Sequence, residues 1–410
     1  MPSFRSSLRA RLRTNGGNVV RRLGLLPAGD PDGLGEDRQL GDVAPSQRVV
    51  AFFPEPPRNS YQLAQWVDAL IALDARHGVL LITQDSRTAG VLRGLTSLQV
   101  LCVGRAATLD GLVSRGQLAL ALYVSHHPRN FFLLRYPGLA HVYLGHGDSD
   151  KHISASNQLK AYDRSFVAGQ AAIDRVRTEL VWFDPQRLVP IGQPQLAALP
   201  PRRSAARTTV LYAPTWEGGQ PSVAYTSVAS HGETLVRSLT AVGMRVVYRP
   251  HPRTGANRRD IADADAALRR VLAEPDVAAT GSVVDTGSRV EESFAEADLL
   301  ITDISALAVE WLPTGRPLVV TEPAGPDAKV PRSRLLEAVP RLPADAASRA
   351  AELVTRCLST DPEREARAAL VEHYLGGADP ATAVERFLAA CDDVLTARDA
   401  ARARLVDTAP

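Results

Sequence analysis

Leu299-Leu300-Ile301-Thr302-Asp303-Ile304-Ser305 joins an apolar run to a polar tip, and it is among the most informative stretches of the chain. The residues that follow, 306–311, show a helical pattern, so a strand gives way to a helix at the tip. Two other apolar runs end alike, in Tyr212-Ala213-Pro214-Thr215 and in Arg249-Pro250-His251-Pro252. In an open α/β sheet, ligands bind outside the carboxyl ends of the strands. The three tips therefore predict one phosphate or nucleotide site.

Apolar runs alternate with helical patterns along most of the chain, which predicts mostly parallel sheets covered on both faces. The first half has expected strands at 48–54, 78–84, 98–103, 118–125, 141–145, 165–168 and 188–191. The second half has them at 208–212, 245–248, 299–302 and 317–321, with a weaker one near 282–284. The clearest helix is expected over 60–75, with Ser60 as its cap.

The alternation breaks at 196–207 and then restarts, which places a domain boundary there. We expect a basic arm and linker at 1–47, Rossmann-like domains at 48–200 and 201–345, and C-terminal helices at 346–410. Asp379-Pro380 is expected to open the last long helix, since proline fits the first helical turn. The predicted fold is therefore α/β, with two doubly wound domains facing a cleft that binds the ligand.

Composition excludes several classes of protein. The 410 residues are 45% hydrophobic and 22% charged, with a net charge of +2, so a global nucleic-acid-binding field is not expected. The three cysteines lie far apart in apolar contexts, which argues against a disulfide framework and favours a reducing, cytoplasmic compartment. No apolar run reaches membrane-spanning length, and no signal peptide is evident.

The N-terminus carries six arginines, at positions 5, 9, 11, 13, 21 and 22, before the first acid, Asp30. One interpretation is a peripheral contact with anionic lipid at the cytoplasmic face of the plasma membrane, where each arginine contributes about 1 kcal/mol. The other is a solvated arm, because Gly16-Gly17 interrupts any continuous amphipathic helix.

The three tips carry groups that suit a diphosphate. A helix that starts after Asp303 offers free N–H groups to an anion, and Ser305 adds a hydroxyl. His251, as an imidazolium beside Arg249 and Arg253, would make charge-assisted hydrogen bonds, and Thr215 could donate another. The plainer interpretations are a helix capped by Asp303 or Ser305, a rigid turn at His251 and a simple turn after Tyr212.

His146 stands between two glycines just after an expected strand, which makes it a candidate general base. Asp148 or Asp150 could orient it, and the alternative is a loop histidine among solvated charges. The two aspartates could also hold a divalent metal against phosphates, but such pairs are common and Lys151 competes for their charge. His126-His127 has no matching ligands for zinc. We therefore expect no metal.

Several common sites are absent from the sequence. It contains no Gly-x-x-x-x-Gly-Lys-Ser/Thr of P-loop enzymes, no early Gly-x-Gly-x-x-Gly of dinucleotide-binding domains and no Gly-x-Ser-x-Gly elbow of hydrolases. We expect no cofactor.

Taken together, the motifs resemble those of the CDP-glycerol glycerophosphotransferases of teichoic-acid synthesis. The family's Tyr-Ala-Pro-Thr, His-Pro and Ile-Thr-Asp-Tyr-Ser-Ser match residues 212–215, 251–252 and 301–306. The family also has a Trp-His-Gly-Thr-Pro-Leu-Lys motif, and this chain keeps its histidine, glycine and lysine at the same spacing, as His146, Gly147 and Lys151. A further family motif, Gly-x-Pro-Arg, resembles residues 192–195. This chain departs from the family's motifs at Gly145, at Asp148-Ser149-Asp150, at Gln195, and at Ile304 and Ala306.

The resemblance implies a GT-B-like fold with an N-terminal acceptor domain and a C-terminal nucleotide-donor domain. It implies that a polyol-phosphate unit passes from CDP-glycerol to a hydroxyl on a polymer or lipid-linked acceptor in cell-wall or capsule synthesis. His146 would be the catalytic base with Asp148 beside it, and Lys151 would bind the acceptor or a phosphate. Thr215, Arg249, His251, Asp303 and Ser305 would bind the nucleotide diphosphate.

Two alternatives remain open at this point. One is a GT-B glycosyltransferase that uses a nucleotide sugar at the same strand ends. The other is a non-catalytic relative that binds a nucleotide or polymer, which the altered segment around His146 favours. The acids at 148 and 150 would repel an anionic acceptor, so a neutral hydroxyl acceptor or another donor is also considered.

Overall fold

The computed structural model describes residues 35–151, 155–196, 199–203, 206–287, 289–377, 379 and 381–407. The arginine-rich arm, for which membrane contact is predicted, lies outside these residues. The chain divides into two compact units. Unit 1 comprises residues 1–142 and 394–410, and unit 2 comprises residues 143–393. The segment boundaries predicted from the sequence, and the cleft between two domains, stay predictions.

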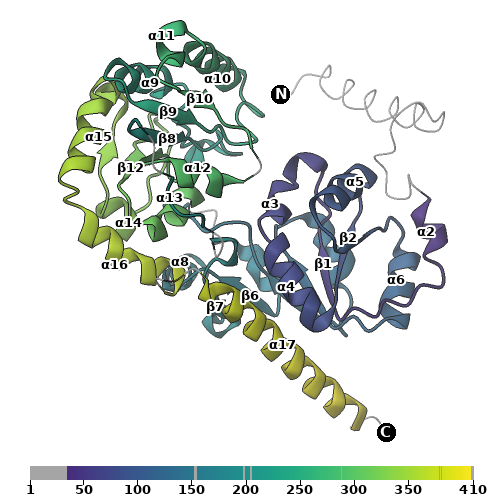
Figure 1. Ribbon diagram of the computed structural model, residues 1–410. Coiled ribbons are helices and arrows are strands. Elements are labelled where there is room, and N and C mark those ends of the chain that lie inside the picture. The colour runs from purple at the N-terminus through teal and green to yellow at the C-terminus, as the bar shows by residue number, and fades with distance from the viewer. Residues whose placement is uncertain are drawn as a thin grey trace, which may run out of the picture. The chain divides into compact units, whose positions relative to one another are not determined.

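Unit 1 is built on a parallel sheet in the order β3-β2-β1-β4-β5, of which β1 and β2 are labelled in Figure 1. Its strands are β1 (Val49–Phe52), β2 (Val79–Thr83), β3 (Gln99–Cys102), β4 (Leu120–Tyr123) and β5 (Ala140–Tyr143). Nearly every residue of these strands is buried, as expected where helices cover both faces of a parallel sheet. The main helices are α4 (Val67–His77), α5 (Ser86–Leu95) and α6 (Ala106–Arg115), and the shorter ones are α2 (Glu36–Gln39), α3 (Tyr61–Ala64) and α7 (Phe131–Leu134).

The prediction of one continuous helix over 60–75, capped by Ser60, is wrong. The structure has two helices there, α3 and α4, separated at Gln65 and Trp66. Ser60 precedes α3, but its side chain makes no capping hydrogen bond. Trp66 is buried and only 3% exposed, so it joins the core that the apolar face of α4 also contacts.

Unit 2 contains a six-stranded parallel sheet in the order β10-β9-β8-β11-β12-β13 (Figure 1). The strands are β8 (Thr209–Ala213), β9 (Arg245–Tyr248), β10 (Val283–Val284), β11 (Leu299–Thr302), β12 (Leu318–Thr321) and β13 (Arg341–Leu342). In chain order this is 3-2-1-4-5-6, the doubly wound arrangement. The first five strands match the prediction, and the two-residue β13 was not predicted. Unit 2 also holds the parallel pair β6 (Arg164–Val167) and β7 (Leu188–Pro190).

Helices cover both faces of this six-stranded sheet. Alternate strand residues such as Tyr212, Tyr248 and Ile301 pack with α9 (Gly232–Ala241), α10 (Arg259–Leu272) and α15 (Ala350–Ser359). Their neighbours Leu211, Val247 and Leu300 pack in a second core with other helices. Those helices are α12 (Val290–Glu296), α13 (Ala306–Trp311), α14 (Arg334–Glu337) and α16 (Arg364–Leu375). The remaining helices of unit 2 are α8 (Gln170–Glu179) and α11 (Pro275–Ala278).

The C-terminal tail is helical, as predicted, in α15, α16 and α17 (Thr382–Asp407). Asp379 accepts a hydrogen bond from the N–H of Ala381 at 2.9 Å, while Pro380 lies outside the described residues. The end of α17 belongs to unit 1, where Asp399 pairs with Arg48 at 2.5 Å. The predicted fold class, two doubly wound α/β sheets with C-terminal helices, is therefore confirmed.

Candidate active site

The three polar tips follow three neighbouring strands at one edge of the unit 2 sheet. β8 lies between β9 and β11, all parallel, with Tyr212 opposite Tyr248 and Ala213 opposite Thr302. The strand order reverses between β8 and β11, and such a switch point is where doubly wound sheets bind ligands. The prediction that the tips share one edge is confirmed.

Asp303 ties these tips together. Its side chain is fully buried, and one carboxylate oxygen accepts hydrogen bonds from the N–H groups of Thr215 at 2.6 Å and Ser227 at 3.3 Å. The other oxygen accepts from Thr321 Oγ1 at 2.5 Å, at the end of β12. Burial raises the pKa of Asp303, and these donors oppose the rise. Asp303 thus positions Thr215, and its direct contact with a diphosphate stays a prediction.

Ser305 does not cap α13 with its side chain. Thr302 Oγ1 donates to the carbonyl of Ala213 at 2.6 Å, so the Ser305 hydroxyl donates to Thr302 Oγ1, 3.1 Å away. The capping interpretation is therefore wrong for Ser305. A ligand anion at the strand ends would offer this hydroxyl a stronger, charge-assisted acceptor.

His251 is held in a defined orientation after β9. Its Nδ1 accepts a hydrogen bond from the N–H of Arg253 at 3.0 Å, so the proton of the neutral ring is on Nε2. The ring stacks on Trp216, with 6.2 Å between centroids. Burial and the charges of Lys151, Arg253 and His146 lower the pKa of His251 to about 3. The expected imidazolium is therefore wrong, and the site offers a neutral N–H donor.

Two acids fix the loop that carries His251. Glu217, only 2% exposed, accepts hydrogen bonds from the N–H groups of Gly255, Asn257 and Arg258 at 2.9, 2.6 and 3.2 Å. Arg249 donates to Asp285 at 2.5 Å and to the carbonyl of Gly287 at 2.7 Å. A diphosphate would compete with Asp285 for Arg249, and the predicted role of Arg249 in binding stays a prediction.

The segment around His146 lies against the start of α13. Gly147 has a φ of 121°, and a Cβ there would lie 2.9 Å from the Cβ of Ala306, so the approach requires glycine. Lys151 reaches the loop after β8, where its Nζ donates to Thr215 Oγ1 at 3.1 Å. Burial lowers the pKa of Lys151 to about 8, and the charge of Asp303 opposes this. The structure therefore brings the His146 segment and the three tips together within unit 2.

Asp148 and Asp150 are engaged by other elements of unit 2. Asp148 accepts from Arg175 of α8 at 2.6 Å, and Asp150 accepts from the hydroxyl of Tyr374 of α16 at 2.8 Å. Burial raises the pKa of Asp148, while Arg175 opposes the rise. These contacts anchor the segment and partly neutralise the acids expected to repel an anionic acceptor. The predicted role of Asp148 beside His146 stays a prediction.

Neither candidate metal position forms a cluster in the structure. Within the part of the chain that the structure describes, no group of three or more His, Cys, Asp or Glu side chains is placed to hold a metal ion. In unit 1, His127 accepts a hydrogen bond from the N–H of Arg129 at 3.1 Å and so caps a 3-10 turn, Pro128–Asn130.

Glu310 is a site residue that the sequence interpretation missed. It is 3% exposed, and its carboxyl group makes no hydrogen bond to any residue that the structure describes. A Cβ on Gly147 would lie 3.4 Å from its Oε1, which puts the carboxyl beside the His146 segment. Burial, with the charge of Glu291, raises its pKa to about 7. The sequence does contain a signal for Glu310, because a spacing of four residues puts it on the same helical face as Ala306.

Comparison with known protein families gives one match over most of the chain. Residues 120–376 match the family described as CDP-Glycerol:Poly(glycerophosphate) glycerophosphotransferase. This range includes every predicted site residue. A search of curated proteins found no match.

Comparison with solved structures supports the fold. The wall teichoic acid polymerase TagF is similar with a TM-score of 0.59 and 14% identity, over 96% of this chain and 98% of that one. A putative UDP-N-acetylglucosamine 2-epimerase from Listeria monocytogenes gives 0.54 and 13%, over 85% and 96%. Anabaena HepE in complex with UDP-glucose gives 0.53 and 12%, over 84% and 99%. At these identities the likeness establishes the GT-B-type fold alone.

Asp303→Ala should lower the free energy of unfolding by about 3 kcal/mol, because three buried donors lose their acceptor at about 1 kcal/mol or more each. Asp303→Asn should cost about 1 kcal/mol, since its carbonyl can still accept from Thr215 and Ser227 while the Thr321 hydroxyl turns to accept. Denaturant unfolding measures both. Ser305→Ala is the control and should be nearly neutral. Equal stability of wild type and Asp303→Ala would contradict the role given to Asp303.

Proposed function

Because the chain belongs to the CDP-glycerol:poly(glycerophosphate) glycerophosphotransferase family, we propose that the edge of the unit 2 sheet around Lys151 and Thr215 is its donor site. The chain is a glycerophosphotransferase-like enzyme of teichoic-acid-type polymer synthesis, and CDP-glycerol is its donor. The observation that carries the site assignment is the hydrogen bond from Lys151 Nζ to Thr215 Oγ1, 3.1 Å long. It joins the segment that holds His146 to the strand-end motifs.

The groups at this edge suit the diphosphate of CDP-glycerol. Lys151 supplies a cation in a buried position, where its attraction for an anion is stronger than in water. Thr215 and Ser305 supply hydroxyl donors, and the Nε2–H of His251 supplies another. Fixed donors around a phosphoryl group stabilise the charge of its transition state.

His146 is proposed as the general base. It precedes Gly147, which lies against the start of α13, and it interacts electrostatically with His251, so it is near the donor site. In the proposed step, His146 takes the proton of the acceptor hydroxyl. The hydroxyl oxygen forms a bond to the β-phosphorus of CDP-glycerol, the bond from that phosphorus to the bridging oxygen breaks, and CMP leaves. Proton transfer by a positioned histidine fits this chemistry.

The acceptor is proposed to be a hydroxyl at the end of a polymer or lipid-linked chain. We also retain the proposal that the arginine-rich N-terminus contacts anionic lipid at the cytoplasmic face of the membrane, although that arm lies outside the described residues. Among the helices of the described ranges, none combines the length and apolar character needed to cross a bilayer.

His146→Ala should abolish glycerophosphate transfer and leave CDP-glycerol binding intact, because the base acts on the acceptor and not on the donor. Release of CMP measures the first, and isothermal titration with CDP-glycerol measures the second. His77→Ala, which removes a histidine of unit 1, is the control and should transfer normally. Transfer at the wild-type rate by His146→Ala would rule out its role as base.

Affinity for CDP-glycerol should fall as pH rises through about 8, because the pKa of Lys151 is about 8 and only its protonated form attracts the diphosphate. One pH unit above that pKa, about a tenth of Lys151 keeps its charge, so a loss of up to about tenfold is expected between pH 7 and pH 9. Lys151→Met should bind weakly without this pH dependence, and Lys160→Met should behave as wild type. Titration calorimetry at several pH values measures this. If Lys151→Met showed the same pH dependence of CDP-glycerol affinity as the wild type, a group other than Lys151 would be responsible for it.

A further inference from the structure

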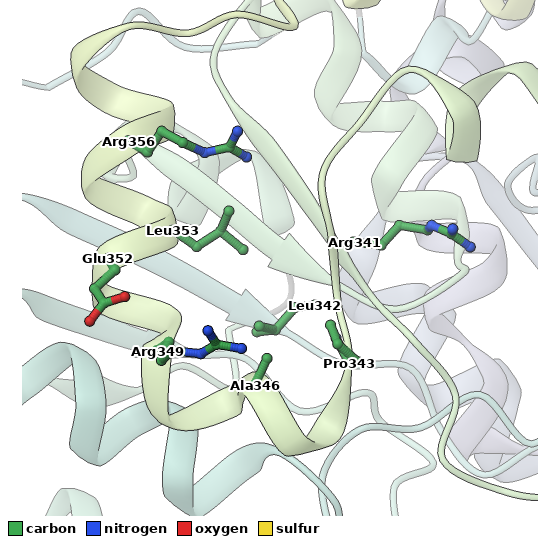
Figure 2. A pocket seen from close by; sticks show the side chains of 8 residues that line it. All are labelled: Arg341, Leu342, Pro343, Ala346, Arg349, Glu352, Leu353 and Arg356. Atoms are coloured by element: carbon green, nitrogen blue, oxygen red, sulfur yellow. The ribbon is translucent and has the colours of Figure 1, made fainter.

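A hollow of about 320 Å³ lies next to β13, between this strand and the helical segment that follows it (Figure 2). Leu342 and Leu353 give it apolar walls, and three arginines, Arg341, Arg349 and Arg356, line it with a single acid, Glu352. None of these residues belongs to the donor site. The hollow therefore combines a positive charge excess with apolar surface.

The two arginines of the helical segment lie on one face. Arg349 ends a 3-10 turn, Ala344–Arg349, and Arg356 is seven residues on, in α15. Figure 2 shows both side chains extending from the helical segment toward β13, with Leu353 between them. At a rise of about 1.5 Å per residue the two backbone positions are about 10 Å apart, so each guanidinium could bind a separate anion.

The charges of these arginines are only weakly compensated. Arg341 lies 3.4 Å from Glu322 and Arg356 lies 3.8 Å from Glu363, with each arginine side chain about half exposed. Such exposed pairs contribute little to stability. Arg349 forms no ion pair with any residue of the described ranges. Arg341 precedes Leu342 in β13, so its side chain points to the other face of the strand, and Figure 2 shows it extending away from Arg349 and Arg356. An anionic ligand in the hollow could therefore engage Arg349 and Arg356.

The hollow starts at the same sheet edge as the donor site. β13 runs parallel to β12, with Leu342 opposite Thr321, and Thr321 donates to Asp303. Because parallel strands end at a common edge, a chain held in the hollow begins two strands away from β11 and its Asp303 tip.

We propose that this hollow binds the phosphodiester backbone of the growing poly(glycerophosphate) chain. Guanidinium groups bind phosphate through paired hydrogen bonds, and separate arginines fit a chain with regularly repeated phosphates. The glycerol carbons between phosphates would pack on Leu342 and Leu353. The occupant is inferred from the polymer in the family's description, so the inference rests on the proposed function.

The test is the affinity of a fluorescent poly(glycerophosphate) oligomer for the full chain, measured by polarisation over a range of salt concentrations. The double variant Arg349→Ala/Arg356→Ala should bind about tenfold more weakly at low salt and show a shallower salt dependence. Glu352→Gln should bind more tightly. Arg270→Ala, which removes an exposed arginine of α10 outside the hollow, is the control and should bind as wild type. The affinity of each variant for CDP-glycerol verifies that unit 2 is folded.

Weaker oligomer binding by the double variant, with Arg270→Ala unchanged, supports the proposal. Equal affinity and equal salt dependence of the double variant and Arg270→Ala overturn it. Unchanged oligomer binding together with lost binding to vesicles of anionic phospholipid also overturns it, and assigns the hollow to lipid headgroups. If the wild type binds the oligomer but releases no CMP from CDP-glycerol, the proposed function fails while the polymer site stands.

Discussion

The buried carboxylate of Asp303 is the constraint on which the site depends. It accepts hydrogen bonds from the loop after β8 and from Thr321, the last residue of β12, while it belongs to the tip of β11. A buried acid is stable only when its oxygens are satisfied. The hydrogen bond to Asp303 fixes the backbone at Thr215. The Thr215 hydroxyl in turn accepts a hydrogen bond from Lys151, which belongs to the His146 segment. A single buried acid thus connects the sheet to both the donor motifs and the proposed base.

The fold could be predicted because its strands are continuous apolar runs, which indicate a parallel sheet covered on both faces. Continuous apolar strands such as β8 and β11 can only lie in a sheet covered on both faces, and their shared direction places the residues that follow them at one edge. The family resemblance rests on those same residues, and the match over residues 120–376 confirms it. Hence the fold class, the shared edge and the family were predictable from the sequence.

Other features depend on partners that sequence spacing does not reveal. Asp148 reads as a companion of His146, yet it meets Arg175, which lies 27 residues further on. His251 is expected to be a cation from the sequence, yet burial and the neighbouring charges of Lys151 and Arg253 lower its pKa to about 3. No pattern in the sequence marks Glu217, yet this acid is buried and accepts hydrogen bonds from the N–H groups of Gly255, Asn257 and Arg258. Charge states and buried polar contacts depend on the tertiary structure, so the sequence alone does not fix them.

The central claim is that the donor diphosphate binds at the switch point between β8 and β11. A crystal structure of the full chain with CDP-glycerol tests it most directly. We expect diphosphate oxygens within hydrogen-bonding distance of Lys151 Nζ and Thr215 Oγ1, with the Nε2 of His251 directed toward them. A diphosphate bound instead at the ends of the unit 1 strands, or in the arginine-lined hollow beside β13, would contradict it.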